Sequence, residues 1–176
     1  MRLLVLRLAP VLASVVLVGP FVLPAFAQAS CAGASARPAS AHAAAVSAAT
    51  LCLLNRERAH HGLGSLHANA SLELAAWRHS RDMALHNFFA HGNFVGRLAR
   101  AGYFRGRRSW TVGENIAWGA GSHATPASIV WSWMHSPPHR ANILNGGFHH
   151  IGVGLVSGAP VPHVLRAATY TTDFGG

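Results

Sequence analysis

Apolar residues in the first half of the chain recur at helical spacing. From Val46 they repeat every three or four positions up to Gly62, which predicts an amphipathic helix that ends at this glycine. Asn69 is a candidate N-cap for a second helix, which we expect to end near Asn87. The apolar face of this second helix, expected to be well buried, comprises Leu72, Leu74, Ala76, Trp77, His79, Met83 and Leu85.

The pattern changes from helical to alternating in the second half. Residues 95–101 suggest a short third helix, and residues 115–118 suggest a short strand. Thr125 followed by Pro126 is typical of a helix start, and two prolines at 137 and 138 should stop that helix. Residues 151–155 and 164–171 alternate as strands do. Helices that precede a late antiparallel sheet predict an α+β domain.

The N-terminal stretch does not share these patterns. Arg2 and Arg7 precede an apolar run that ends at Ala25-Phe26-Ala27, which is typical of a signal peptide over residues 1–27. The alternative is a membrane anchor, which the prolines and glycines inside the run disfavour. Residues 28–45 are rich in Ala and Ser and are expected to form a flexible leader. The folded domain is therefore expected over residues 46–176.

Charge and cysteine content narrow the class of protein. The chain has 14 basic residues, all of them arginine, against 5 acidic ones, and loss of residues 1–27 would leave a net charge of +7. No nucleic-acid-binding motif accompanies this charge, so a basic secreted protein is favoured over a nucleic-acid partner. Cys31 and Cys52 can form a disulfide in an oxidising compartment, although the sequence leaves that pairing open.

Three polar residues stand in unusually apolar surroundings. Glu114 and His139 lie among tryptophans and isoleucines, and His91 follows a Phe-Phe-Ala run. Burying such groups is costly unless they are paired or hydrogen-bonded. We therefore expect His91, Glu114 and His139 to meet at one concave site. The aromatic residues around these motifs are expected to be mostly core, with some available to line an apolar groove: Phe88, Phe89, Trp110, Trp118, Trp131 and Trp133.

The order of six short motifs resembles the CAP superfamily, the group of cysteine-rich secretory proteins, antigen 5 and pathogenesis-related class 1 proteins, in its bacterial SCP-like form. The motifs are Leu54-Asn55-x-x-Arg58, Ser80-x-Asp82-Met83-Ala84, Asn87-Phe-x-x-His91, Gly113-Glu114-Asn115-Ile116-Ala117, Trp133-x-x-Ser136-Pro-x-His139-Arg-x-Asn142-Ile143-Leu144 and Ile151-Gly152-Val153-Gly154. The resemblance implies an α-β-α sandwich around a three-stranded antiparallel sheet. It also implies a cleft lined by His91, His139 and Glu114. Many relatives carry a second cleft acid, which residues 133–136 lack here.

The cleft is open to three interpretations. It can bind a small apolar ligand, lipid or sterol-like, or an extracellular partner, with Asn115 and Ser136 beside the three residues above. It can hold zinc through His91 and His139, with Glu114 as the general base of a hydrolase. It can also be a structural cluster in which Glu114 accepts hydrogen bonds from both rings. We favour the structural cluster over a physiological metal site, and a binding role in the extracellular space or cell envelope over an enzyme. No Gly-x-Ser-x-Gly motif is present, and Ser136 is expected to cap a turn.

Overall fold

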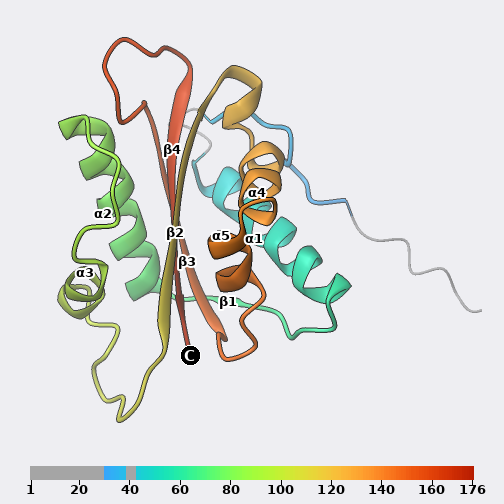
Figure 1. Cartoon of the computed structure of the whole chain (residues 1–176), viewed down its shortest axis with the longest axis vertical. Coiled ribbons are helices and arrows are strands. Elements are labelled where there is room, and N and C mark those ends of the chain that lie inside the picture. The colour runs from blue at the N-terminus through green and yellow to red at the C-terminus, as the bar shows by residue number, and fades with distance from the viewer. Residues whose placement is uncertain (1–29, 39–42) are drawn as a thin grey trace, which may run out of the picture.

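The computed structural model describes residues 30–38 and 43–176, and in this part the chain forms three layers. A central sheet separates α2 (Ala70–His86) and α3 (Phe94–Arg100) on one side from α1 (Ala43–His60), α4 (Pro126–Met134) and α5 (Pro137–Ile143) on the other (Figure 1). The expected α-β-α sandwich is therefore confirmed. The predicted signal peptide lies outside the described residues, and no described helix is long and apolar enough to cross a membrane.

The sheet has the strand order β1-β3-β4-β2. The three long strands, β2 (Val112–Ala120), β3 (His150–Ser157) and β4 (Ala167–Gly175), pair antiparallel with β4 in the centre. These are the three strands that the family resemblance implies. A short fourth strand, β1 (His67–Ala68), pairs parallel with the start of β3. Two residues are too few to show alternation, so β1 could not be predicted from the sequence.

Local capping chemistry sets the ends of the helices. The Asn69 side chain accepts hydrogen bonds from the backbone N–H groups of Ser71 and Leu72, which begins α2 as predicted. Asn87 ends this helix in the left-handed region, with φ of 53°. Thr125 caps α4, which has a proline in its first turn. Helix α1 begins at Ala43, three residues before the predicted start, because its first turn consists of alanines that carry no periodic signal.

A disulfide joins the segment before α1 to that helix. Cys31 and Cys52 are bonded, with their Cα atoms 5.7 Å apart. The neighbouring Ala34 packs against the core, and its carbonyl accepts a hydrogen bond from the backbone N–H of Ala127 in α4. The described part of the segment at 30–38 is thus tied to both α1 and α4.

The motif Ile151-Gly152-Val153-Gly154 allows α2 to lie directly on β3. A Cβ atom at Gly152 would come within 2.0 Å of the backbone of Leu72, and one at Gly154 within 2.1 Å of the backbone of Trp77. Real side chains cannot approach a backbone so closely, so a larger residue at either position would push the helix away from the sheet. This contact sets the distance between α2 and the sheet. It therefore also sets the positions of the site residues on α2 and on the loop after it.

The surface of the molecule carries more aromatic residues than the sequence predicted. On α2, Leu72, Ala76, His79 and Met83 are buried as expected, but Leu74, Trp77 and Leu85 are exposed. The sheet covers one face of the helix only, and these three residues point away from it. Trp133 is buried and donates to the carbonyl of Ile116, whereas Phe89, Trp110, Trp118 and Trp131 are exposed. The expectation that most of these aromatics belong to the core was wrong.

Candidate functional site

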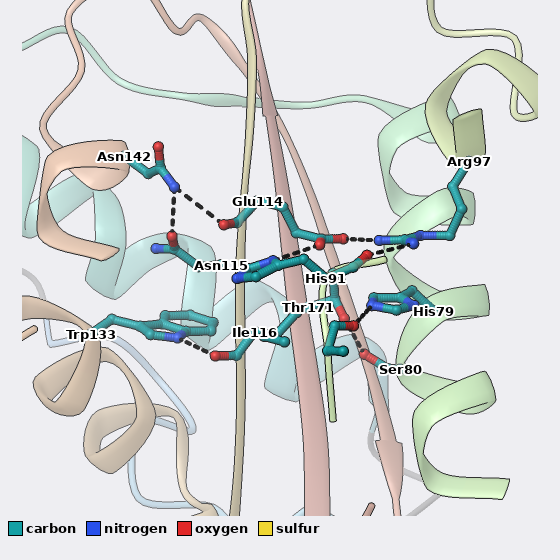
Figure 2. Close-up of polar contacts among 11 residues, drawn as sticks. His79, Ser80, His91, Arg97, Glu114, Asn115, Ile116, Trp133, Asn142 and Thr171 are labelled. Carbon is teal, nitrogen blue, oxygen red and sulfur yellow. Dashed lines mark hydrogen bonds and ion pairs between the residues drawn. The ribbon is translucent and has the colours of Figure 1, made fainter. Parts of the chain in front are cut away.

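Glu114 is the centre of the candidate site. It lies on β2, and its side chain, only 1% exposed, points toward the layer that contains α2 and α3 (Figure 2). One carboxylate oxygen accepts a hydrogen bond from Nδ1 of His91 at 2.8 Å, and the other forms an ion pair with Arg97. A buried carboxylate needs such partners, because an unpaired one would lose its hydration without compensation.

Arg97 fastens the loop after α2 to the sheet. Besides Glu114, its guanidinium donates to the backbone carbonyl of His91 at 2.8 Å. Helix α3, which carries Arg97, is begun by Asn93, whose side chain accepts from the backbone N–H of Gly96. In the sequence, Arg97 is one of 14 arginines and gave no sign of this role. The available signal was its position in the first turns of a capped helix just after His91.

A buried histidine on α2 is hydrogen-bonded to the same loop. His79 on α2 forms a hydrogen bond through Nε2 with the carbonyl of Ala90, at 3.0 Å. Burial lowers the pKa of His79, and the nearby Glu114 charge opposes this shift. The residue before His91 is therefore anchored to α2, while His91 itself remains half exposed, with 51% of its side chain accessible.

A second carboxyl group lies behind Glu114. Asp173 on β4 pairs with Glu114 in the register of the sheet, and it is fully buried. Within the described residues, neither of its oxygens meets a hydrogen-bond donor. Burial, and then the charge of Glu114, raise the pKa of Asp173 well above its ordinary value, while Arg97 acts in the opposite direction. No motif in the sequence singled out Asp173.

His139 lies on α5, on the other side of β2. Its Nδ1 and the Ser136 hydroxyl are 2.7 Å apart in a hydrogen bond, and its backbone carbonyl accepts from Nδ2 of Asn115 at 3.0 Å. Burial lowers the pKa of His139, and the proximity of His91 lowers it further. Ser136 occupies the N-cap position of α5, yet its hydroxyl bonds to the His139 ring instead of capping the helix.

Asn142 connects the two halves of the site. Its side-chain amide donates to the backbone carbonyl of Glu114 at 3.2 Å and to Oδ1 of Asn115 at 2.9 Å. Neighbouring residues of a strand point to opposite faces, so Glu114 reaches toward Arg97 while Asn115 reaches toward Asn142 (Figure 2). The backbone of β2 thus links the His91 half to the His139 half.

The structure brings the five predicted residues into one hydrogen-bonded network, but not in the predicted arrangement. Glu114 hydrogen-bonds to only one of the two rings: its second oxygen pairs with Arg97, and the His139 ring bonds instead to Ser136. A cluster in which Glu114 accepts from both rings is therefore not what the chain forms. Across the described part of the chain, no group of three or more His, Cys, Asp or Glu residues is arranged to hold a metal ion.

Comparison with known proteins identifies the family. The model of the CAP family (cysteine-rich secretory protein family) matches residues 51–169, so the chain belongs to the CAP family. It is 39% identical over 110 residues to the uncharacterized protein YkwD of Bacillus subtilis, covering 62% of this chain and 42% of YkwD. It is 33% identical over 110 residues to the uncharacterized membrane protein YlbC of the same organism, covering 60% of this chain and 30% of YlbC. The chain thus spans less than half the length of either relative.

Solved structures show the same fold. An extracellular protein containing an SCP domain from Bacillus anthracis superposes with a TM-score of 0.56 at 31% identity, covering 71% of this chain and 38% of that protein. An outer surface protein of Borrelia burgdorferi has a TM-score of 0.56 at 18% identity, covering 70% of this chain and 86% of that protein. The second likeness is one of fold alone.

Proposed function

We propose that the chain is a secreted CAP-domain protein that binds a small apolar ligand, lipid or sterol-like. The observation that carries this proposal is an apolar hollow between α1 and α4, in which a tryptophan remains exposed to solvent. Ligand pockets are concave and mostly apolar with a few polar groups at the edge, and this hollow has both properties.

The hollow has a volume of about 300 Å³, at the lower end of the range for small-molecule pockets. Its apolar lining comes from Leu53 on α1 and from Ala127, Val130, Trp131 and Met134 on α4, and its polar lining consists of Arg56, Glu57 and His135. Trp131 is 62% exposed and stacks on the His135 ring with the centroids 4.0 Å apart. Covering about 100 Å² of apolar tryptophan surface would contribute roughly 2–3 kcal/mol to binding.

The cleft provides a second proposed contact surface, formed by His91, Glu114, His139, Asn115 and Ser136. Its most exposed residue is His91, with Phe89 exposed two positions earlier in the chain. An exposed imidazole suits the polar end of an amphiphilic ligand or a partner's backbone. In this proposal Glu114 holds the His91 ring in place and does not itself contact the ligand.

A zinc-assisted hydrolase has weaker support. A catalytic zinc takes three protein ligands, and the candidate set here offers two imidazoles. Glu114, the candidate general base, has both oxygens engaged by His91 and Arg97. The donor set does not fit a catalytic zinc, so we derive no reaction through a metal.

Secretion is the part of the proposal that the comparisons support. One structural relative, 31% identical to this chain, is described as extracellular. The bonded pair Cys31 and Cys52 fits an oxidising compartment, because cytosolic thiols are kept reduced. Sequencing the N-terminus of the protein recovered from culture medium tests it, since the signal-peptide prediction requires a start at Gln28.

A titration with a fluorescent fatty-acid analogue tests the binding function. We expect saturable binding to the purified chain, weakened about tenfold or more by Trp131→Ala, because the variant loses the apolar surface estimated above. Trp110→Ala is the matched control: it removes another exposed tryptophan, one that stacks on Phe104 outside the hollow, and should change affinity less than about twofold. Equal loss in both variants, or no saturable binding at all, would contradict the proposal.

A further inference from the structure

The outer side of α2 carries a second hollow of different chemistry. It has a volume of about 350 Å³ and lies where α3 approaches α2. Four arginines line it, two from each helix: Arg78 and Arg81 on α2, and Arg97 and Arg100 on α3. In both pairs the residues are three positions apart, so they lie on the same side of their helix, one turn apart.

Three of these arginines are not neutralised. Arg97 is neutralised by its ion pair with Glu114. Within the described part of the chain, the side chains of Arg78 and Arg100 take part in no hydrogen bond or ion pair. The Arg81 guanidinium lies over the ring of Trp77, with its carbon 5.9 Å from the ring centroid. Like charges around one hollow repel each other when no opposite charge compensates them. An anion that binds there relieves this repulsion and stabilises the folded chain.

Acidic groups at the hollow do not cancel this charge. Asp82 is the one carboxylate that lines it, and its Oδ1 is 2.8 Å from Nδ1 of His86 on the next turn. The three positive charges of Arg78, Arg81 and Arg100 and the one negative charge of Asp82 give the hollow a net charge of +2. A phosphate group carries about −1.5 to −2 charges near neutral pH, which balances that charge.

The shape of the guanidinium group also favours phosphate. Its donors form a planar fork that binds two phosphate oxygens at once, and forks from two helices can approach different oxygens of one group. Trp77, Ala75 and Leu85 add an apolar surface beside the charges. A ligand with a phosphate and a small apolar part would use both.

We propose that the hollow between α2 and α3 is a phosphate-binding site, formed by Arg78, Arg81 and Arg100. It is separate from the apolar hollow, which lies between α1 and α4 on the opposite side of the sheet (Figure 1). The phosphate can belong to a soluble phosphorylated compound or to a lipid headgroup, because the recognition chemistry is the same.

Isothermal titration of the purified full chain with inorganic pyrophosphate, at physiological salt, tests the site. We expect saturable binding, weakened about tenfold or more in the double variant Arg78→Gln, Arg100→Gln, because each change removes charge-assisted hydrogen bonds. The matched control is Arg105→Gln, Arg108→Gln, which removes the same charge from two exposed arginines outside the hollow and should change affinity less than about twofold. Circular dichroism of both variants shows whether they remain folded.

Vesicles of phosphatidylglycerol and of phosphatidylcholine distinguish the two sources of phosphate. Pyrophosphate binding without vesicle binding assigns the site to a soluble ligand. Binding of both pyrophosphate and phosphatidylglycerol vesicles, each reduced in the Arg78/Arg100 variant only, assigns it to a headgroup. The proposal is overturned if the wild-type chain shows no saturable heat, or if the two double variants lose binding equally, since that reports net charge alone.

Discussion

Glu114→Gln is the substitution that examines the site most closely. It keeps the volume of the side chain and removes the charge that Arg97 and His91 hold. Because only 1% of the Glu114 side chain and 15% of the Arg97 side chain are exposed, solvent screens this pair weakly. Breaking a buried ion pair from one side costs about 3–5 kcal/mol.

Two features of the structure lower that cost. A glutamine oxygen can still accept from His91, and the neutral side chain no longer repels a charge on Asp173, its cross-strand neighbour. We therefore expect Glu114→Gln to lower the free energy of unfolding by roughly 2–3 kcal/mol, leaving the chain folded, since domains of this size have about 5–15 kcal/mol in total. Urea unfolding followed by tryptophan fluorescence measures this value, with Glu73→Gln, an exposed acid on α2, as the control.

A double-mutant cycle with Arg97→Gln isolates the interaction. Arg97→Gln leaves the Glu114 carboxylate buried without its cation. Each single substitution breaks the same ion pair, so the sum of the two losses in stability includes that ion pair twice. The double variant should be more stable than the sum of the single effects predicts by about 2 kcal/mol. Additivity to within about 0.5 kcal/mol would show that the ion pair does not hold the loop after α2 on the sheet, and would refute this account of the site.

Three further predictions concern stability. The folded pKa of Asp173 is raised, so between its ordinary value of 3.8 and the folded pKa this group lowers the stability of the folded chain as the pH rises. Asp173→Asn removes this contribution, so the stability of the variant relative to the wild type should increase from about pH 4 to about pH 8 in urea unfolding. Equal pH dependence in the two proteins would contradict the placement of Asp173. Arg58→Met should cost about 4 kcal/mol by the same assay, because this fully buried guanidinium donates to four backbone carbonyls; a loss below about 1 kcal/mol would contradict that role. Replacing Cys31 and Cys52 by serine should cost about 3 kcal/mol for a loop of 21 residues, and an unchanged melting temperature would count against it.

Much of the fold follows from local signals in the sequence. The starts at Asn69 and Thr125 were predictable because a cap is made by a side chain and backbone groups two or three residues away. The late strands were predicted in part. β3 covers the predicted residues 151–155, whereas β4 begins at Ala167, three residues after the predicted start, and is buried along its whole length because helices cover both faces of the sheet (Figure 1). The contact between His91 and Glu114 was expected from the family resemblance, and from the physical point that polar groups in apolar surroundings need partners.

What the sequence did not reveal depends on contacts between distant elements. Asp173 became a neighbour of Glu114 only through the register of β2 against β4, which no local pattern encodes. Arg97 looked like one more exposed arginine until α3 was placed over the sheet. Trp77 and Trp131 have the apolar character of core residues. They are exposed because no other described element of the fold covers their sides of α2 and α4.

Native mass spectrometry of the protein purified from culture medium, without chelator, shows whether the chain carries an apolar ligand. We predict a lipid-sized adduct on the wild-type chain that is lost in Trp131→Ala and retained in Trp110→Ala. A bare polypeptide mass for the wild type would contradict binding of an apolar ligand. A zinc adduct that disappears in His91→Ala and His139→Ala would contradict our preference for a binding protein over a metal-dependent enzyme.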